Sequence, residues 1–232
     1  MKQMLREAIR KGQKSLSEHD SRTVIESAGV SLSRGKLVNT RAEAVSVARE
    51  IGFPVVLKGC GHELTHKTEL GAVRLKLRDR EEVSEAYDEI TGINAQMDGV
   101  LVQEWISGDG REFVMGLTRD QQFGPCVMFG LGGIFTEALN DVSFRVAPLT
   151  VYDAEEMINE IRTRKLLDEF RGSPAVDREV LVKSLIGLGE LGTGYDEIKE
   201  IDINPVIISG TVPVAVDALV VLETGNGLGV NA

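Results

Sequence analysis

The sequence has little of several features that would assign a protein quickly to a class. Its 232 residues contain two cysteines, Cys60 and Cys126, without a CxxC pair or the dense spacing of a disulfide framework. We therefore expect two packed thiols in a reducing compartment. No apolar run approaches the roughly 20 residues of a membrane-spanning helix, and residues 1–15 lack the apolar core of a signal peptide. These absences predict a soluble cytoplasmic protein with no membrane partner.

The usual glycine-rich nucleotide motifs are absent too. No GxxxxGK[ST] segment occurs, and GLGGIF at 130–135 lacks the sixth-position glycine and the helical pattern of a dinucleotide fingerprint. FGLGG at 129–133 is still a candidate anion-binding turn, because its backbone N–H groups could point at one ligand. The formal net charge of −10 argues against nucleic acid as a partner. A nucleotide could be bound only through local basic residues, backbone N–H groups and metal ions.

Hydrophobic periodicity predicts two lobes of different texture. The first, residues 1–97, includes an N-terminal arm and reads as a small βα lobe, and the second, residues 98–232, is rich in strands. The class is therefore α/β or α+β with a cleft between the lobes. Helices are predicted over 15–30, 41–52, 80–90, 152–168 and 177–191, and strands over 54–58, 73–77, 99–106, 112–118, 125–130, 200–208 and 211–222.

The C-terminal strands predict an acidic hairpin. In EIDINPVII, strand alternation places Glu200, Asp202 and Asn204 on one face. If Ser209 and Gly210 form the turn, Asp202 lies directly opposite Asp217, where like charges destabilise a sheet. A cation would remove this conflict, and two carboxylates with an amide carbonyl suit Mg²⁺. The alternative is a solvated polar face without a metal, and the prolines at 205 and 213 leave the register open.

Three further segments are candidates for nucleotide chemistry. Lys58 ends a predicted strand before a glycine-rich loop, where its ammonium group could reach a phosphate or simply be solvated. His66 lies in the polar segment THKTELG and is either a functional or an ordinary surface histidine. The segment Gln103, Glu104, Trp105 and Ile106 joins the predicted lobes, where backbone groups could contact an adenine edge or serve only as a linker.

Taken together, these segments resemble the β subunit of ADP-forming acetyl-CoA synthetases, which are relatives of succinyl-CoA synthetase. The matching stretches run in the same order over most of residues 15–222: VVLKGCGHELTHKTELGAVRLKL, LVQEWISGDGREFVMGLTRDQQFGPCVMFGLGGIFTEALNDVSFRVAPL, and EIDINPVI with the later Asp217. One departure is TELGA at 68–72, where the family pattern is closer to SDVGG. The His-Lys pair before it is retained.

The resemblance implies an ATP-grasp fold with ATP or ADP held between two lobes and Mg²⁺ at the end of the triphosphate. By matching position, Lys58 is expected at the α and β phosphates and the segment 103–106 at the adenine. Glu112 is expected at the ribose or phosphates, and His66 as the phosphate carrier. The implied metal ligands are Asp202, Asn204 and Asp217.

The chain has no recognisable CoA-binding domain, so the resemblance also implies a CoA-binding α subunit and an α2β2 heterotetramer. The expected reaction is acyl-CoA + ADP + phosphate giving acid + ATP + CoA, with phosphate relayed through a phosphohistidine. Two alternatives are an autonomous ATP-grasp carboxylate ligase and a non-catalytic nucleotide-sensing subunit. The residues do not reveal the acyl group or decide between ATP and GTP.

Overall fold

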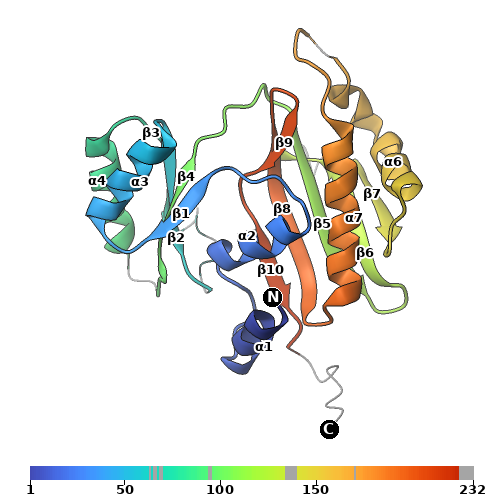
Figure 1. Ribbon diagram of the computed structural model, residues 1–232, viewed down its shortest axis with the longest axis horizontal. Coiled ribbons are helices and arrows are strands. Elements are labelled where there is room, and N and C mark those ends of the chain that lie inside the picture. Colours follow the sequence, from blue (N-terminus) through green and yellow to red (C-terminus); the bar gives the residue numbers. More distant parts are fainter. Residues whose placement is uncertain are drawn as a thin grey trace. The chain divides into compact units, whose positions relative to one another are not determined.

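The structure is a computed structural model that describes residues 1–62, 64, 67, 70–93, 96–133, 140–169 and 171–224. The chain divides into two compact units, and each has its own antiparallel sheet (Figure 1). Unit 1 comprises residues 1–15, 21–32 and 107–232, and unit 2 comprises residues 16–20 and 33–106. Among the described helices, none combines the length and the apolar character that crossing a membrane requires.

Unit 2 is a four-stranded sheet with the order β1-β4-β2-β3, packed against two helices. Thr40 and Asp79 cap these helices, each accepting a hydrogen bond from a backbone N–H in the first turn. Small and branched side chains of both helices are buried against the central strands. The elements are β1 (Gly35–Val38), α3 (Arg41–Ile51), β2 (Val55–Cys60), β3 (Val73–Leu77), α4 (Arg80–Thr91) and β4 (Gly99–Glu104).

The division between the units differs from the boundary expected after residue 97. Strand β4 pairs with both β1 and β2, so residues 99–104 belong to the sheet of unit 2, and that unit ends at Ile106. Most of the N-terminal arm belongs to unit 1. Its helix α1 (Lys2–Arg10) is held by an ion pair of 2.7 Å between Arg6 Nε and Glu197 Oε1. Periodicity marks a strand but not its hydrogen-bonded neighbours, and the neighbours decide the boundary here.

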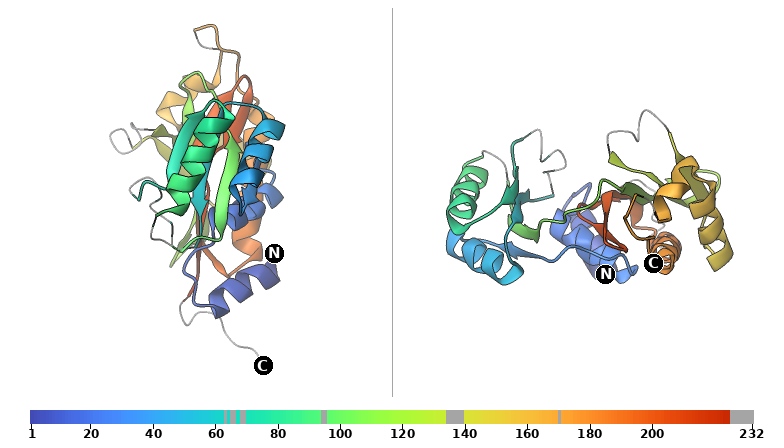
Figure 2. Two further views of the ribbon diagram at one scale, coloured as in Figure 1. Left: turned by 90° about the vertical axis from the view of Figure 1, so that its left-hand side faces the viewer. Right: turned by 90° about the horizontal axis from the view of Figure 1, so that it is seen from above.

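Unit 1 is built on a sheet with the order β10-β8-β5-β6-β7, with β9 also paired to β8. Helices α6 and α7 lie on one face of it (Figures 1 and 2). Helix α7 approaches β5 closely at Gly192, where an added Cβ would lie 2.7 Å from the side chain of Leu117. The elements are β5 (Glu112–Asp120), β6 (Gly124–Leu131), β7 (Val142–Val146), α6 (Val151–Glu160), α7 (Arg178–Gly194), β8 (Ile198–Ser209), β9 (Val212–Ala215) and β10 (Leu219–Leu222).

The single helix expected over 152–168 is two elements. Helix α6 ends before Ile161, whose backbone is extended with φ −63° and ψ 139°, and a 3-10 helix, η2 (Arg162–Leu167), follows. The buried carboxylate of Asp141 accepts hydrogen bonds from the N–H groups of Arg162 and Thr163 at 2.7 and 2.9 Å. The carboxylate of Asp141, about 20 residues earlier in the chain, thus caps the start of η2 and separates it from α6. Helical periodicity does not reveal such a contact.

The predicted register of the acidic hairpin is wrong by two positions. Ser209 pairs with Val212, so the two-residue turn is Gly210-Thr211, and Asp202 pairs with Leu219 of β10 instead of Asp217. Gly210 has φ +63°, a conformation that favours glycine and is required at the first position of the common two-residue hairpin turns. The turn therefore forms one residue later than expected.

Candidate functional site

The acidic residues of β8 lie on the face of the unit 1 sheet that is turned away from α7. Asp202 pairs with Gly116, the neighbour of Leu117, and Leu117 packs against α7. Because successive residues of a strand point to opposite faces, Asp202 points away from that helix. Ile201 and Ile203 are buried on the helix side, while Asp202 is half-buried and Asn204 is exposed. The predicted alternation of β8 is therefore confirmed.

Asp202 and Asp217 are electrostatically coupled even though they are not paired across the sheet. Burial raises the pKa of Asp202 to about 6, and the negative charges of Glu200 and then Asp217 add to the shift. Asp217 lies between β9 and β10, and its Oδ1 accepts a hydrogen bond of 3.0 Å from the N–H of Ala218. The chain thus brings together carboxylates that repel one another, which is the electrostatic condition that the sequence predicted.

A divalent cation suits this donor set. Two carboxylates and the amide oxygen of Asn204 are hard ligands of the kind that Mg²⁺ prefers, with its remaining positions filled by water and phosphate oxygens. Within the described residues, no group of three or more His, Cys, Asp and Glu side chains is arranged to hold a metal. The assignment of Asp202, Asn204 and Asp217 as metal ligands therefore stays a prediction from the sequence.

Lys58 does not end its strand and is not solvated. Strand β2 continues to Cys60, and the whole of Lys58 is only 7% exposed. Its Nζ donates to Oε1 of Glu18 at 2.8 Å. The lysine lies in the middle of the sheet, paired with Leu101 of β4 and Val73 of β3. Any phosphate contact of this lysine is therefore made by an ammonium group that the protein already holds in place.

Glu18 is a residue of this region that the sequence reasoning missed. It begins helix α2 (Glu18–Ser27) and is 4% exposed. Its Oε1 accepts from Lys58, and its Oε2 accepts from the ammonium group of Lys67. An acidic residue in the first turn is common in helices because it favours the helix dipole, so the local sequence carried no signal of this role.

The segment expected at the adenine is partly engaged within unit 2. Gln103 is 1% exposed, and its Nε2 donates to Oγ of Ser33. The carboxylate of Glu104 pairs with Arg34, with Nε to Oε2 at 3.0 Å, which lowers the pKa of that carboxyl. Trp105 and Ile106 are half-buried, and the N–H of Trp105 donates to the carbonyl oxygen of Pro54 at 3.3 Å. Ile106 is the last residue of unit 2.

Glu112 lies against the glycine-rich turn. Its carbonyl oxygen accepts a hydrogen bond of 2.8 Å from the N–H of Gly132. Gly133 has φ +73°, and an added Cβ there would lie 2.9 Å from Oε2 of Glu112. Gly133 is therefore favoured by its backbone conformation, and it lies close to the carboxylate of Glu112. His66, the candidate phosphate carrier, lies outside the described residues.

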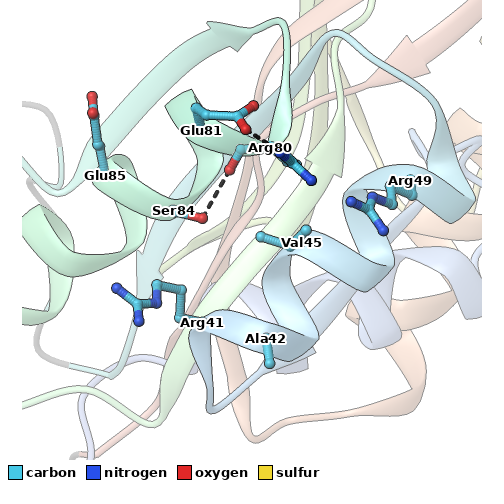
Figure 3. Close-up of a pocket in the computed structure, with 8 residues that line it drawn as sticks. All are labelled: Arg41, Ala42, Val45, Arg49, Arg80, Glu81, Ser84 and Glu85. Atoms are coloured by element: carbon cyan, nitrogen blue, oxygen red, sulfur yellow. Dashed lines mark hydrogen bonds and ion pairs between the residues drawn. The ribbon is translucent and has the colours of Figure 1, made fainter.

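A pocket of about 610 Å³ lies between α3 and α4, lined by residues of both helices (Figure 3). Its arginines are largely committed to ion pairs, since Arg41 Nη1 contacts Asp88 at 2.8 Å and Arg80 contacts Glu81. Of the predicted site residues that the structure describes, none lines this pocket. The pocket is therefore separate from the candidate chemistry.

The ATP-grasp domain family matches residues 7–222 of the chain. This match covers both units and defines the class of the fold, in agreement with the sequence prediction.

Similar proteins identify the family more closely. The β subunit of acetate–CoA ligase [ADP-forming] I from Pyrococcus furiosus is 40% identical over 213 residues, which are 89% of this chain and 91% of that protein. The β subunit of isoform II from the same organism is 36% identical, covering 95% of this chain and 97% of that one. Acetyl-coenzyme A synthetase 1 of Ca. Korarchaeum cryptofilum, solved with coenzyme A and Ca-AMPCP, has a TM-score of 0.89 and 46% identity over 96% of this chain and 99% of that chain. The chain belongs to the family of β subunits of ADP-forming acetate–CoA ligases.

Proposed function

We propose that this chain is the nucleotide-binding subunit of an ADP-forming acyl-CoA synthetase and that it passes a phosphoryl group between a phosphohistidine and ADP. The overall reaction is acyl-CoA + ADP + phosphate giving acid + ATP + CoA. The relatives named above support the ligase activity. One Ca. Korarchaeum cryptofilum structure, with 46% identity, is described with coenzyme A and Mg-AMPPCP and with its phosphohistidine segment pointing towards the nucleotide-binding site.

The observation that carries the proposal is the coupled acid pair on β8 and after β9. Asp202 has a pKa raised to about 6 by burial and by the charges of Glu200 and Asp217. A bound cation would offset the negative charge that these carboxylates share. When bound, Mg²⁺ would offset charge on the phosphate oxygens of the transferring group. Asp202, Asp217 and Asn204 would hold it.

The chain's own residues supply the remaining steps. Lys58, held by Glu18, places a positive charge for the nucleotide phosphates. His66 is assigned as the carrier. In the direction of ATP synthesis, the N–P bond of its phosphoimidazole breaks, and a terminal oxygen of ADP forms the new O–P bond. The electron pair of the N–P bond returns to the imidazole, and because the other ring nitrogen carries a proton, the imidazole leaves as a neutral group ready to accept phosphate again.

A partner subunit completes the enzyme, because the family's β subunits belong to multi-subunit ligases. In this proposal the partner is a CoA-binding α subunit, and the assembly is an α2β2 heterotetramer. The acyl group is left open, because similar proteins include a 4-hydroxybutyrate–CoA ligase and a trans-feruloyl-CoA synthase. The alternative function is that of an autonomous carboxylate ligase, which would need no phosphorylated histidine.

The test is to purify the chain with its co-associating partner, identify that partner by mass, and incubate the complex with γ-³²P-labelled MgATP. After an alkaline quench, in which phosphohistidine survives, label is expected on His66, and His66→Ala should abolish label on both subunits. A neighbouring substitution, His62→Ala, serves as the control for general disturbance of this segment. Label that reaches the partner at a near-normal rate in His66→Ala would eliminate the relay.

A further inference from the structure

The carboxylate of Glu18 is a single acceptor shared by two lysines. Its side chain is 2% exposed, and those of Lys58 and Lys67 are 9% and 11% exposed. Each ammonium group contacts a different oxygen of the same carboxylate. A buried charge is costly to leave unpaired, so these contacts strongly restrict where both ammonium groups can lie.

The backbone that carries Glu18 is itself fastened to the strand that carries Lys58. The N–H of His19 donates to Sγ of Cys60, two residues beyond Lys58 on β2, at 3.4 Å. Oγ of Ser17 accepts from the N–H of Asp20 at 3.2 Å and thereby caps the start of α2. The start of the helix and the strand are thus joined by a hydrogen bond from the backbone of His19 to the side chain of Cys60 as well as by the ion pair. The carboxylate is a fixed part of this region rather than a mobile surface group.

From this arrangement we infer that Glu18 is a positioning residue, which holds Lys58, and with it Lys67, in the orientation that binds nucleotide phosphates. The inference rests on the proposed phosphate role of Lys58. A lysine has a flexible four-carbon stem, and ordering it at the moment of binding weakens affinity. An acceptor that orders it beforehand removes that loss.

Glu18 could also weaken nucleotide binding, so the direction of the affinity change in Glu18→Gln distinguishes two effects. The negative charge of Glu18 also repels phosphate, so its removal would by itself favour nucleotide binding. Without the carboxylate, however, the buried Lys58 ammonium group loses the charge of Glu18 and becomes harder to keep charged and oriented. A glutamine has one acceptor oxygen, and its NH₂ group cannot accept from the second lysine. Positioning therefore predicts weaker binding in Glu18→Gln, and dominant repulsion predicts tighter binding.

The experiment measures MgADP binding to the full chain by titration calorimetry, with a thermal melt of every variant. Lys58→Met keeps the apolar stem but removes the charge, and we expect it to bind MgADP about tenfold more weakly or worse. Glu18→Gln should lose a similar factor of about ten, and Glu18→Asp, which keeps both oxygens, should stay within about threefold of the original chain. The double variant Glu18→Gln with Lys58→Met should bind within about twofold of Lys58→Met alone. Glu18 acts on binding through the Lys58 ammonium group, which is already absent in Lys58→Met.

The matched control is Glu197→Gln, which replaces another buried glutamate with an ion pair to an arginine, Arg6, at 2.7 Å. It should lower the melting temperature and leave MgADP affinity unchanged. Unchanged or tighter binding in Glu18→Gln, or losses that simply add in the double variant, would overturn the positioning role while leaving the phosphate role of Lys58 intact. Normal binding by Lys58→Met would instead reject the phosphate role, and the inference would fall with it.

Discussion

Replacing Asp202 by asparagine should stabilise the metal-free protein while impairing its response to Mg²⁺. The substitution keeps the shape of the side chain and removes the charge that Glu200 and Asp217 oppose. The physical reason is linkage: the folded chain binds the Asp202 proton more tightly than the unfolded chain does, because burial and neighbouring charge raise its folded pKa. The charged form is therefore a cost to the folded state.

The size of this cost follows from the pKa. Its rise from the ordinary 3.8 to about 6 is roughly two pKa units, which corresponds to about 3 kcal/mol at most. Asp202 is half-buried, so solvent screening reduces the expected gain to about 1–2 kcal/mol. For a chain of this length that is roughly 2–8 °C in melting temperature. The stability that Asp202→Asn gains over the original chain is full above the folded pKa of about 6. It declines as pH falls toward 3.8 and is absent below that value.

The assay is thermal unfolding of both proteins in EDTA across this pH range, repeated with excess Mg²⁺ at pH 8. Asp202→Asn should melt higher than the original chain at pH 8, with a smaller difference at pH 5. Mg²⁺ should raise the melting temperature of the original chain more than that of the variant. The control is Asp196→Asn, since Asp196 is 82% exposed in a loose pair with Arg119. A variant that is no more stable in EDTA at pH 8, or a difference independent of pH, would refute the reasoning.

Two further predictions test local contacts within unit 1. Gly133→Ala should lower stability by about 1–2 kcal/mol, because φ is +73° and the new Cβ would lie 2.9 Å from Oε2 of Glu112. Urea unfolding should show a smaller loss for Gly172→Ala, where φ is +86° but the space is open, and equal losses would exclude the contact with Glu112. Asp109→Asn should destabilise the chain at neutral pH, because the hydrogen bond from Arg111 lowers the pKa of Asp109 to about 2. This loss should fade as pH falls from 3.8 toward 2 in urea titrations, and a loss that persists there would contradict the cause.

The sequence predicted elements well where a single periodicity ran through them. The helices expected over 41–52 and 80–90 appear as α3 and α4, and the strand over 73–77 is β3. Helix α1 and the strands β1 and β7 were not anticipated. β1 and β7 have only four and five residues, and their strand character depends on pairing with β4 and β6. The four residues of β1, GKLV, show no alternation, and in β7, VSFRV, the polar Ser143 is buried while the apolar Phe144 and Val146 are exposed, so that apolar pattern does not mark a buried face.

The acidic site was predicted in composition but not in register. Alternation along β8 placed Asp202 on the face opposite Ile201 and Ile203, and the structure confirms this because alternation depends only on the strand itself. The partner of Asp202 depended on where the turn forms, and a glycine can occupy either turn position. The coupling of Asp202 to Asp217 nevertheless survives the shift, because Asp217 lies two residues before Leu219 of β10, which pairs with Asp202.

The role of Glu18 could not be inferred from the sequence, because it depends on contacts with lysines that are distant from it in sequence. Glu18 and Lys58 are 40 positions apart, and Glu18 and Lys67 are 49 apart. From the sequence, Lys58 could contact a phosphate or simply be solvated, because no partner for it is visible nearby in the chain. In the structure, Lys58 instead forms a buried ion pair with Glu18, and this changes the expected effect of substituting Lys58. Removing the lysine now disturbs a buried carboxylate as well as a phosphate contact, so its binding defect can be interpreted only beside a measured stability and the Glu18 variants.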